Sequence, residues 1–301
     1  MTAPAASPPP VAVLEIGGTH VTAAMVDVRL RSIHERRRAS LDPTGTAQDI
    51  LAALAAAAAS LDRGASRMPW SVAIPGPFDY ARGIGDFTGV GKFGALRGRD
   101  LRAALQERIA PRPDGIVFVN DAEAFALGEW TGRGGTEHRA LYVTLGTGLG
   151  SSFLVDGEPV ADGRGIPPHG QIFRLRWEGR PIERAVSRRT LIDSYAHRTG
   201  LARDVHEIAD AARAGDAAAA RIFAESFRTL GICLAPCVAE FGADALVVGG
   251  SISGSWDLIE APLAEGLAHG DPRTRTTVLR RADDPDGSPL VGAAMASVLR
   301  R

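Results

Sequence analysis

The chain has 301 residues, of which 45% are hydrophobic and 23% are charged, and its formal net charge is −1. These values are ordinary for a globular protein with one large domain or two smaller ones. A net charge so close to zero excludes a general attraction to nucleic acid or to anionic membranes, so we expect neither as a partner.

The first half of the chain predicts a run of strands followed by alternating strands and helices. Strands are expected over 11–16, 21–26, 32–39, 70–74 and 115–119, and helices over 47–61 (ending near Gly64), 99–109 and 122–130. The first two strands flank the turn Gly17-Gly18-Thr19. Glycines let a backbone approach an anion closely, and a threonine hydroxyl with nearby N–H groups can donate to phosphate oxygens.

The second half begins with a turn of the same type. Gly146-Thr147-Gly148 separates apolar, strand-like runs over 141–145 and 151–155. An irregular stretch over 156–180 follows. Helices are then expected over 182–198, 205–214, 217–241, 256–267 and 292–299, with strands over 245–248 and 276–279. Two phosphate-type hairpins suggest a nucleotide held between two related halves of an α/β protein.

The ends and the cysteines point to the cytoplasm. Residues 1–10 are rich in Pro and Ala and lack the basic and apolar regions of a signal peptide, so we expect a disordered tail. We expect no apolar run near the ~20 residues that span a bilayer. Cys233 and Cys237 lie four residues apart in an apolar helical stretch, which favours packed, reduced thiols over a metal site whose other ligands are missing.

Other nucleotide-binding patterns do not fit. A dinucleotide-binding loop would open a helix, whereas both glycine turns here lead into strands. Lys92 follows Gly91, but Asp86 and Phe93 occupy positions where a P-loop needs Gly and Ser or Thr.

Several further motifs, taken in order, resemble the ROK family (repressors, open reading frames and sugar kinases) of the actin-like ATPase superfamily. They run from residue 11 to residue 300 and comprise Leu14–Thr19, Ile74-Pro75-Gly76-Pro77, Asn120-Asp121-Ala122, Leu127-Gly128-Glu129, Leu145–Gly150, Val247–Ser251 and Leu290–Ala294. The resemblance implies two α/β domains of the actin-like, ribonuclease H-like fold around a hinge cleft. We expect a small N-terminal domain over 11–119, onto which a C-terminal helix over 290–301 packs back, and a large domain over 120–289.

The resemblance also implies roles for individual residues. Asp121 would be the catalytic base that aligns a sugar hydroxyl and accepts its proton. From the residues alone, capping of the following helix by Asn120-Asp121 is an equal alternative. The sugar would be bound by Gly76, Pro77, Asn120, Asp121, His169 and Glu183, and ATP by Gly17, Gly18, Thr19, His20, Gly146, Thr147, Gly148, Gly249, Gly250 and Ser251. Mg²⁺ would be carried by the ATP phosphates, with no dedicated protein ligand set.

The chain departs from the family pattern in two places. Glu15 stands where the first phosphate motif usually has Asp, and His20 replaces a basic or polar residue. In the sugar-recognition loop, the family's E-x-G-H and zinc-binding cysteines are absent, and His169 or Gln171 takes the place of E-x-G-H. We therefore expect no structural zinc, with Phe173 and Trp177 packing the loop instead. Zinc-less relatives resemble actinobacterial glucokinases and kanosamine kinases of antibiotic biosynthesis.

The sequence thus predicts a homodimeric, ATP-dependent kinase that phosphorylates the 6-hydroxyl of glucose or an aminohexose such as kanosamine. The alternative is a catalytically silent sugar-binding or regulatory protein. A DNA-binding repressor is disfavoured because only ten residues precede Val11. Polyphosphate as the donor is disfavoured because no long basic channel is evident.

Overall fold

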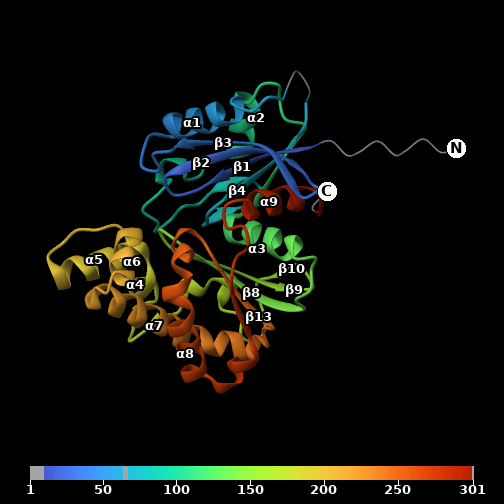
Figure 1. The fold of residues 1–301 in the computed structure, drawn as a ribbon. Coiled ribbons are helices and arrows are strands. Elements are labelled where there is room, and N and C mark those ends of the chain that lie inside the picture. Colours follow the sequence, from blue (N-terminus) through green and yellow to red (C-terminus); the bar gives the residue numbers. More distant parts are fainter. Residues whose placement is uncertain (1–9, 64–66, 300–301) are drawn as a thin grey trace. The chain divides into compact units, whose positions relative to one another are not determined.

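The computed structural model describes residues 10–63 and 67–299, and the chain divides into two compact units (Figure 1). The N-terminal unit runs up to Gly128 and resumes at Asp286, and the C-terminal unit runs from Glu129 to Pro285. The tail expected over residues 1–10 lies, apart from Pro10, outside the described residues, and so does Gly64.

The N-terminal unit is built on a five-stranded mixed sheet. Its strand order is β3 (Ser32–Ser40), β2 (His20–Asp27), β1 (Val11–Ile16), β4 (Pro69–Ile74) and β7 (Gly115–Asn120). The first three strands are antiparallel, and β1, β4 and β7 run parallel. Helices α1 (Ala47–Ala59) and α2 (Leu101–Arg108) lie on one side of this sheet, and α9 (Ser288–Leu299) packs on the other (Figure 1).

Alternation along β1 explains these two layers. Ala12, Leu14 and Ile16 are buried in the core shared with α1, because every second side chain of a strand points to the same face. Glu15 therefore points to the opposite face, the one covered by α9. There it lies opposite Thr22 of β2, which in turn lies opposite Arg38 of β3.

The C-terminal unit has a sheet of the same plan. Its order is β10 (Glu158–Val160), β9 (Leu149–Val155), β8 (Arg139–Leu145), β13 (Ala245–Gly249) and β14 (Val278–Arg281). Again three strands are antiparallel, and β8, β13 and β14 are parallel. The two glycine turns join β1 to β2 and β8 to β9, which are equivalent positions in the two sheets. The prediction of one structural unit used twice is confirmed at the level of topology.

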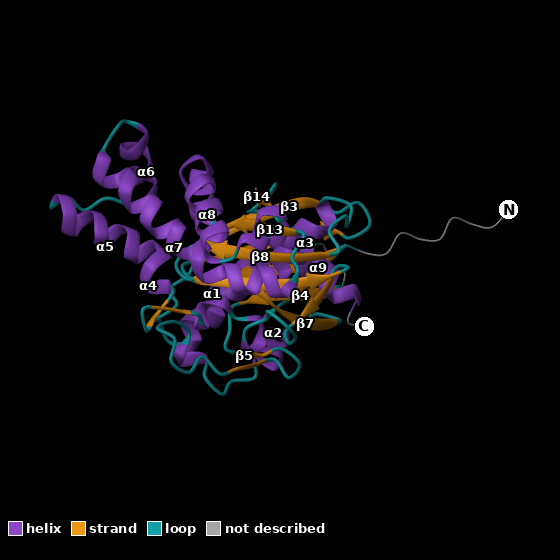
Figure 2. Ribbon diagram, turned by 90° about the horizontal axis from the view of Figure 1, so that it is seen from below, coloured by secondary structure: helices purple, strands orange, loops and turns teal. Residues whose placement is uncertain are grey.

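The helices of the C-terminal unit gather on one side of its sheet (Figure 2). They are α4 (Glu183–Val186), α5 (Arg188–Thr199), α6 (Val205–Arg213), α7 (Ala217–Phe241) and α8 (Trp256–Gly270). The sequence predicts one helix over 182–198, but it breaks at Ser187, whose hydroxyl caps α5 by accepting from the Thr190 N–H. An extended residue that serves as an N-cap ends the helix before it.

Helix α7 corrects one expectation. It is 25 residues long and is the one helix among residues 10–63 and 67–299 that is long and apolar enough to cross a membrane. Half of its most apolar window is buried inside the protein, and the helix packs along α8. Cys237 is buried in this helix and Cys233 is partly buried, and burial raises the pKa of each thiol to about 11, as expected for packed, unreactive cysteines.

The boundary between the two units lies inside α3 (Asp121–Gly132). The domain limit expected from the sequence, at residue 119, lies before this helix. The reason is close packing between α3 and α9. A Cβ atom at Gly128 would lie 1.9 Å from the Ser288 carbonyl oxygen, and one at Gly292 would lie 1.8 Å from that of Ala124. Two glycines thus let the helix backbones touch, which ties the first part of α3 to the N-terminal unit.

Candidate active site

The structure separates the roles of Asn120 and Asp121 at the start of α3. The Asn120 side-chain oxygen accepts from the N–H groups of Ala122 and Glu123, at 3.0 and 3.2 Å, so Asn120 caps the helix. Oδ1 of Asp121 accepts from the N–H of the adjacent Ala122 at 2.9 Å. The capping alternative considered for the pair thus applies to Asn120. Asp121 keeps a carboxylate oxygen that is not used by the helix.

Asp121 lies in a half-buried position whose electrostatics suit a base. Burial raises the pKa of its carboxyl group, and the nearby Lys92 ammonium together with the Ala122 N–H lowers it. The lysine acts on the carboxylate through its charge, and no hydrogen bond between these two side chains occurs among those of the described residues. In the sequence, Lys92 stands out only as part of an incomplete P-loop pattern, which does not predict that it neighbours Asp121.

The first glycine turn lies near this carboxylate, as the effect of Asp121 on the pKa of Glu15 indicates. Burial raises the pKa of Glu15, and Asp121 raises it further, while a hydrogen bond from Thr22 and the charge of Arg38 lower it. Since Glu15 precedes Gly17 by two residues, the turn and Asp121 belong to one region of the N-terminal unit. The departure from Asp to Glu therefore falls at a position in electrostatic contact with Asp121.

The first turn itself is a tight hairpin. The Gly17 N–H donates to the His20 carbonyl at 2.9 Å, and the Leu41 N–H donates to the Thr19 carbonyl at 2.9 Å. The Thr19 hydroxyl and His20 Nδ1 are hydrogen-bonded at 2.8 Å. His20 thus lies against its neighbour, and burial with the charge of Arg38 lowers the pKa of its ring.

A third strand end completes the N-terminal part of the site. Strand β4 ends at Ile74, and the next residues form a turn with a cis peptide between Gly76 and Pro77. The Tyr80 hydroxyl donates to the Ile74 carbonyl at 3.2 Å and accepts from the Asn120 side-chain nitrogen at 2.8 Å. Tyr80 therefore joins the end of β4, just before the Pro-Gly-Pro turn, to Asn120, a link that no local sequence pattern predicts.

The second turn is held at both ends by the helices α4 and α5. The Gly146 N–H donates to the Gly148 carbonyl at 3.1 Å, and the Gly146 carbonyl accepts from the Arg188 N–H at 3.1 Å. At the other end, the Leu149 N–H donates to Glu183 Oε1 at 2.9 Å. Thr147 and Gly148 are exposed between these anchors.

The third glycine motif lies next to this turn. Gly250 has a φ of +82°, and a Cβ there would lie 2.4 Å from the Leu145 carbonyl oxygen, so only glycine fits. A Cβ on Gly146 would lie 3.7 Å from Ser251 Oγ. The structure thus brings together four predicted site residues of the C-terminal unit, which are Gly146, Glu183, Gly250 and Ser251.

The predicted sugar loop is less regular. His169 is exposed and has a left-handed backbone with a φ of +59°. The Gln171 side-chain oxygen accepts from Arg174 Nε at 2.6 Å. Ser151 of β9 holds the loop, because its hydroxyl donates to the Gly170 carbonyl and accepts from the Ile172 N–H.

A short hairpin stands where the family pattern would have its metal-binding cysteines. Strand β11 (Arg176–Trp177) pairs with β12 (Arg180–Pro181) through a turn in which Glu178 and Gly179 both have positive φ, typical of a two-residue hairpin. Trp177 packs against the core of the C-terminal unit as expected, but Phe173 is 38% exposed and does not. Within residues 10–63 and 67–299, no group of three or more His, Cys, Asp and Glu side chains could hold a metal ion.

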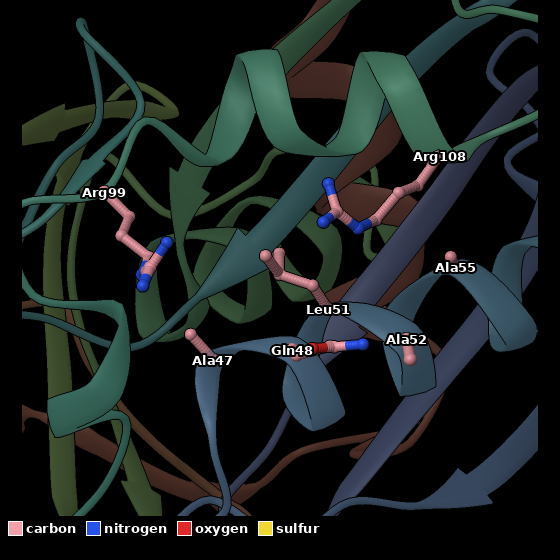
Figure 3. A pocket seen from close by; sticks show the side chains of 7 residues that line it. All are labelled: Ala47, Gln48, Leu51, Ala52, Ala55, Arg99 and Arg108. Atoms are coloured by element: carbon pink, nitrogen blue, oxygen red, sulfur yellow. The ribbon is translucent and has the colours of Figure 1, made fainter.

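A separate groove of about 580 Å³ lies between α1 and α2. Arg99 and Arg108 reach into it from its two ends, over Leu51 (Figure 3). It contains none of the residues that the sequence assigns to catalysis or binding.

Known proteins give an independent comparison. The chain is 26% identical to a glucokinase of Thermotoga maritima, over 84% of this chain and 85% of that protein. It is 26% identical to an N-acetylmannosamine kinase of Citrobacter koseri, over 94% and 96% of the two chains.

A solved structure agrees with the fold. The ROK family glucokinase of Streptomyces griseus, crystallised with glucose and AMPPNP, superposes with a TM-score of 0.79 at 25% identity, over 96% of this chain and 99% of that one. The expected two-unit, actin-like α/β architecture is therefore confirmed. The family model described as "ROK family" matches residues 11–298, and the chain belongs to the ROK family.

Proposed function

We propose that this ROK sugar kinase transfers the γ-phosphoryl group of ATP to the 6-hydroxyl of a glucose-like hexose or aminohexose. The observation that carries the proposal is that Asn120 and Asp121 have different roles at the start of α3. Asn120 caps the helix, which leaves an oxygen of the half-buried Asp121 carboxylate for chemistry. A carboxylate held in this way can orient an alcohol and take its proton.

The electrostatics of Asp121 support the same role. A base must be ionised to accept a proton, yet it must also be basic enough to compete for one. Burial raises the pKa of Asp121, and Lys92 opposes the loss of its charge. Phosphoryl transfer depends mainly on positioning and charge stabilisation. One aligned carboxylate is therefore enough to orient the acceptor hydroxyl and take its proton.

The glycine turns are suited to the phosphates of ATP, which is a substrate here. The turn Gly17-Gly18-Thr19 would offer the N–H groups of Gly18 and Thr19, and the turn Gly146-Thr147-Gly148 those of Thr147 and Gly148, because the Gly17 and Gly146 N–H groups are hydrogen-bonded within their own turns. Thr147 and Gly148 are exposed while the ends of their turn are fixed, which suits backbone donation to an anion. Gly249, Gly250 and Ser251 would receive the adenosine. Mg²⁺ bound to the phosphates would neutralise their charge.

We propose Gly76, Pro77, Asn120, Asp121, His169 and Glu183 as the residues that bind the acceptor. Relatives named for glucose and for N-acetylmannosamine support a hexose or aminohexose as the substrate class. The loop without E-x-G-H changes the donors and acceptors offered to the sugar, and a site altered in this way discriminates against the former substrate. Kanosamine is therefore included among the candidate acceptors.

A second function is a sugar-binding protein without catalysis. The changed loop around His169 and the substitution of Glu at position 15 favour it. The two hypotheses differ in one measurement, which is phosphoryl transfer itself. We also propose that the protein is cytoplasmic and that it forms a homodimer. Analytical ultracentrifugation of the purified chain can test the homodimer.

The decisive experiment supplies the purified protein with Mg·ATP and glucose, mannose, glucosamine, N-acetylated hexosamines or kanosamine, and follows ADP release and sugar phosphate. At least one sugar should be phosphorylated. Asp121→Asn should lower kcat by about 10²–10⁴-fold, with an unchanged circular dichroism spectrum. Sugar binding by calorimetry without turnover of any sugar would instead support the regulatory alternative.

A further inference from the structure

Glu183 is half-buried and contacts the second glycine turn. Its Oε1 accepts a hydrogen bond from the Leu149 N–H at 2.9 Å, and a Cβ on Gly148 would lie 2.8 Å from the same oxygen. A side chain at position 148 would therefore displace the carboxylate. The turn has glycine at the point where Glu183 approaches its backbone.

The backbone of Glu183 is itself fixed. The residue opens α4 directly after Ile182, which is fully buried. Its carbonyl oxygen accepts from the Ser187 N–H at 3.1 Å and from the Thr190 hydroxyl at 3.0 Å. The carboxylate therefore projects from a rigid support, as a side chain that positions a loop must do.

The other end of the turn is fixed by the next helix. The Arg188 N–H at the start of α5 donates to the Gly146 carbonyl at 3.1 Å. Of these two anchors, only the one at Leu149 depends on a side chain, because Arg188 contributes a main-chain group. Substitution of Glu183 is consequently the way to release one end of the turn while the other end stays bound.

We propose that Glu183 is a positioning residue for nucleotide binding, because it holds the Gly146–Gly148 turn in the conformation that presents the N–H groups of Thr147 and Gly148 to phosphate. This inference rests on the proposed function for the identity of the ligand. Among the hydrogen bonds of the described residues, Oε2 of Glu183 takes part in none, and a carboxylate can accept on both oxygens. A sugar hydroxyl on Oε2 fixes the side chain that holds the turn.

One consequence is that the two substrates are coupled. If sugar on Oε2 fixes the carboxylate, less ordering remains to be done when nucleotide binds, and the affinity for nucleotide rises. Linkage requires nucleotide to raise the affinity for sugar by the same factor. Glu183 would thus couple acceptor binding to the conformation of the Gly146–Gly148 turn within the C-terminal unit.

The test measures the Kd of AMPPNP with Mg²⁺ by calorimetry, without sugar and then with the sugar that wild-type protein phosphorylates. Glu183→Ala should weaken AMPPNP binding without sugar by roughly tenfold to a hundredfold, because a charged acceptor for a backbone N–H is lost. It should also abolish the effect of sugar on that Kd. Glu183→Gln keeps an oxygen acceptor and should recover most of the nucleotide affinity.

Glu260→Ala, which removes an exposed helical glutamate of α8, is the matched control and should leave the Kd unchanged. An unchanged AMPPNP affinity in Glu183→Ala, with a loss confined to sugar binding, would overturn the inference. A loss in Glu183→Gln as large as in Glu183→Ala would overturn it too. Since the first measurement needs no acceptor, a wild type that binds AMPPNP but phosphorylates no sugar refutes the proposed function alone.

Discussion

The side-chain nitrogen of Asn120 donates a hydrogen bond to the hydroxyl oxygen of Tyr80 over 2.8 Å. The Asn120 oxygen is committed to the N–H groups of Ala122 and Glu123, which fixes the orientation of the amide. Of the two N–H donors on the Asn120 nitrogen, Tyr80 uses one, so the other remains for a ligand. Tyr80 thereby sets the direction in which Asn120 can donate.

Tyr80→Phe should impair acceptor binding more than catalysis. Without the hydroxyl, the Asn120 amide loses its fixed partner, and we expect the KM for sugar to rise about fivefold while kcat changes little, since one hydrogen bond contributes about 1 kcal/mol. Steady-state kinetics with varied sugar measure this directly.

Tyr195→Phe provides the control, because the Tyr195 hydroxyl is likewise hydrogen-bonded to one side chain, donating to Asp216 at 2.7 Å, but it lies in the C-terminal unit among residues to which we assign no role. It should lower the Tm without raising KM. Equal effects of both variants on KM would show that Tyr80 acts only through stability.

The pH dependence of kcat should show the effect of the Lys92 charge on the pKa of Asp121. Asp121 must be ionised to act as a base, so activity rises with pH through its pKa, which burial raises and Lys92 lowers. Lys92→Met removes the lowering influence, and the acidic limb of the pH–rate profile should move to higher pH. Glu15, whose own pKa is raised by burial and then by Asp121, and Asp286, which acts on Glu15, stay in place in this variant.

Lys92→Arg should restore the position of the limb, because it keeps the positive charge. Arg97→Met is the control, since Arg97 is an exposed cation that is absent from the interactions of Asp121. A limb that does not move in Lys92→Met would mean that another group titrates in the profile.

The sequence predicted the elements well because their signals are local. Short apolar runs define β1 and β2, and a capping residue defines α2, where Asp100 accepts from the Ala103 N–H as a cap should. The glycine turns were also readable, since each interrupts two apolar runs. What the sequence could not give was the set of contacts that depend on tertiary packing.

Lys92 illustrates that limit. Its position follows from Phe93, a fully buried residue with a left-handed backbone at φ +60° whose ring lies 5.5 Å from that of Phe87. Phe87 in turn is bound through its N–H to the Pro77 carbonyl at 2.9 Å. No local pattern around Lys92 predicts that this aromatic cluster directs the lysine toward Asp121, although the glycines on either side of it could have marked the loop as unusual.

Two glycines of α3 should respond oppositely to the same substitution. Gly128→Ala would place a methyl group 1.9 Å from the Ser288 carbonyl oxygen, which forces α3 and α9 apart, and we expect a loss of about 3 kcal/mol or more in unfolding free energy. Gly132→Ala, at the exposed end of the same helix, meets nothing within 4 Å and should be neutral or stabilising by up to about 1 kcal/mol. Urea unfolding of both variants measures the difference, and similar losses would contradict the close packing of the two helices.

The glutamate of the Leu-Gly-Glu motif should prove to be structural. Glu129 is buried, and its two carboxylate oxygens accept from the N–H groups of Asp283 and Asp284 at 2.9 and 3.0 Å. Arg280, whose side chain is 12% exposed, lies 3.5 Å from the same carboxylate. Glu129→Ala leaves the arginine and two N–H groups without that acceptor, and we expect a destabilisation of about 3–5 kcal/mol.

The control for Glu129→Ala is Glu225→Ala, which breaks the exposed ion pair with Arg198, where the side chains are 55% and 38% exposed. That change should cost less than about 1 kcal/mol, because water screens exposed charges. Thermal unfolding compares the two variants, and saturating AMPPNP separates stability from binding. If Glu129→Ala unfolds like wild type but no longer binds AMPPNP, then the motif serves the substrate rather than the segment that leads from β14 to α9.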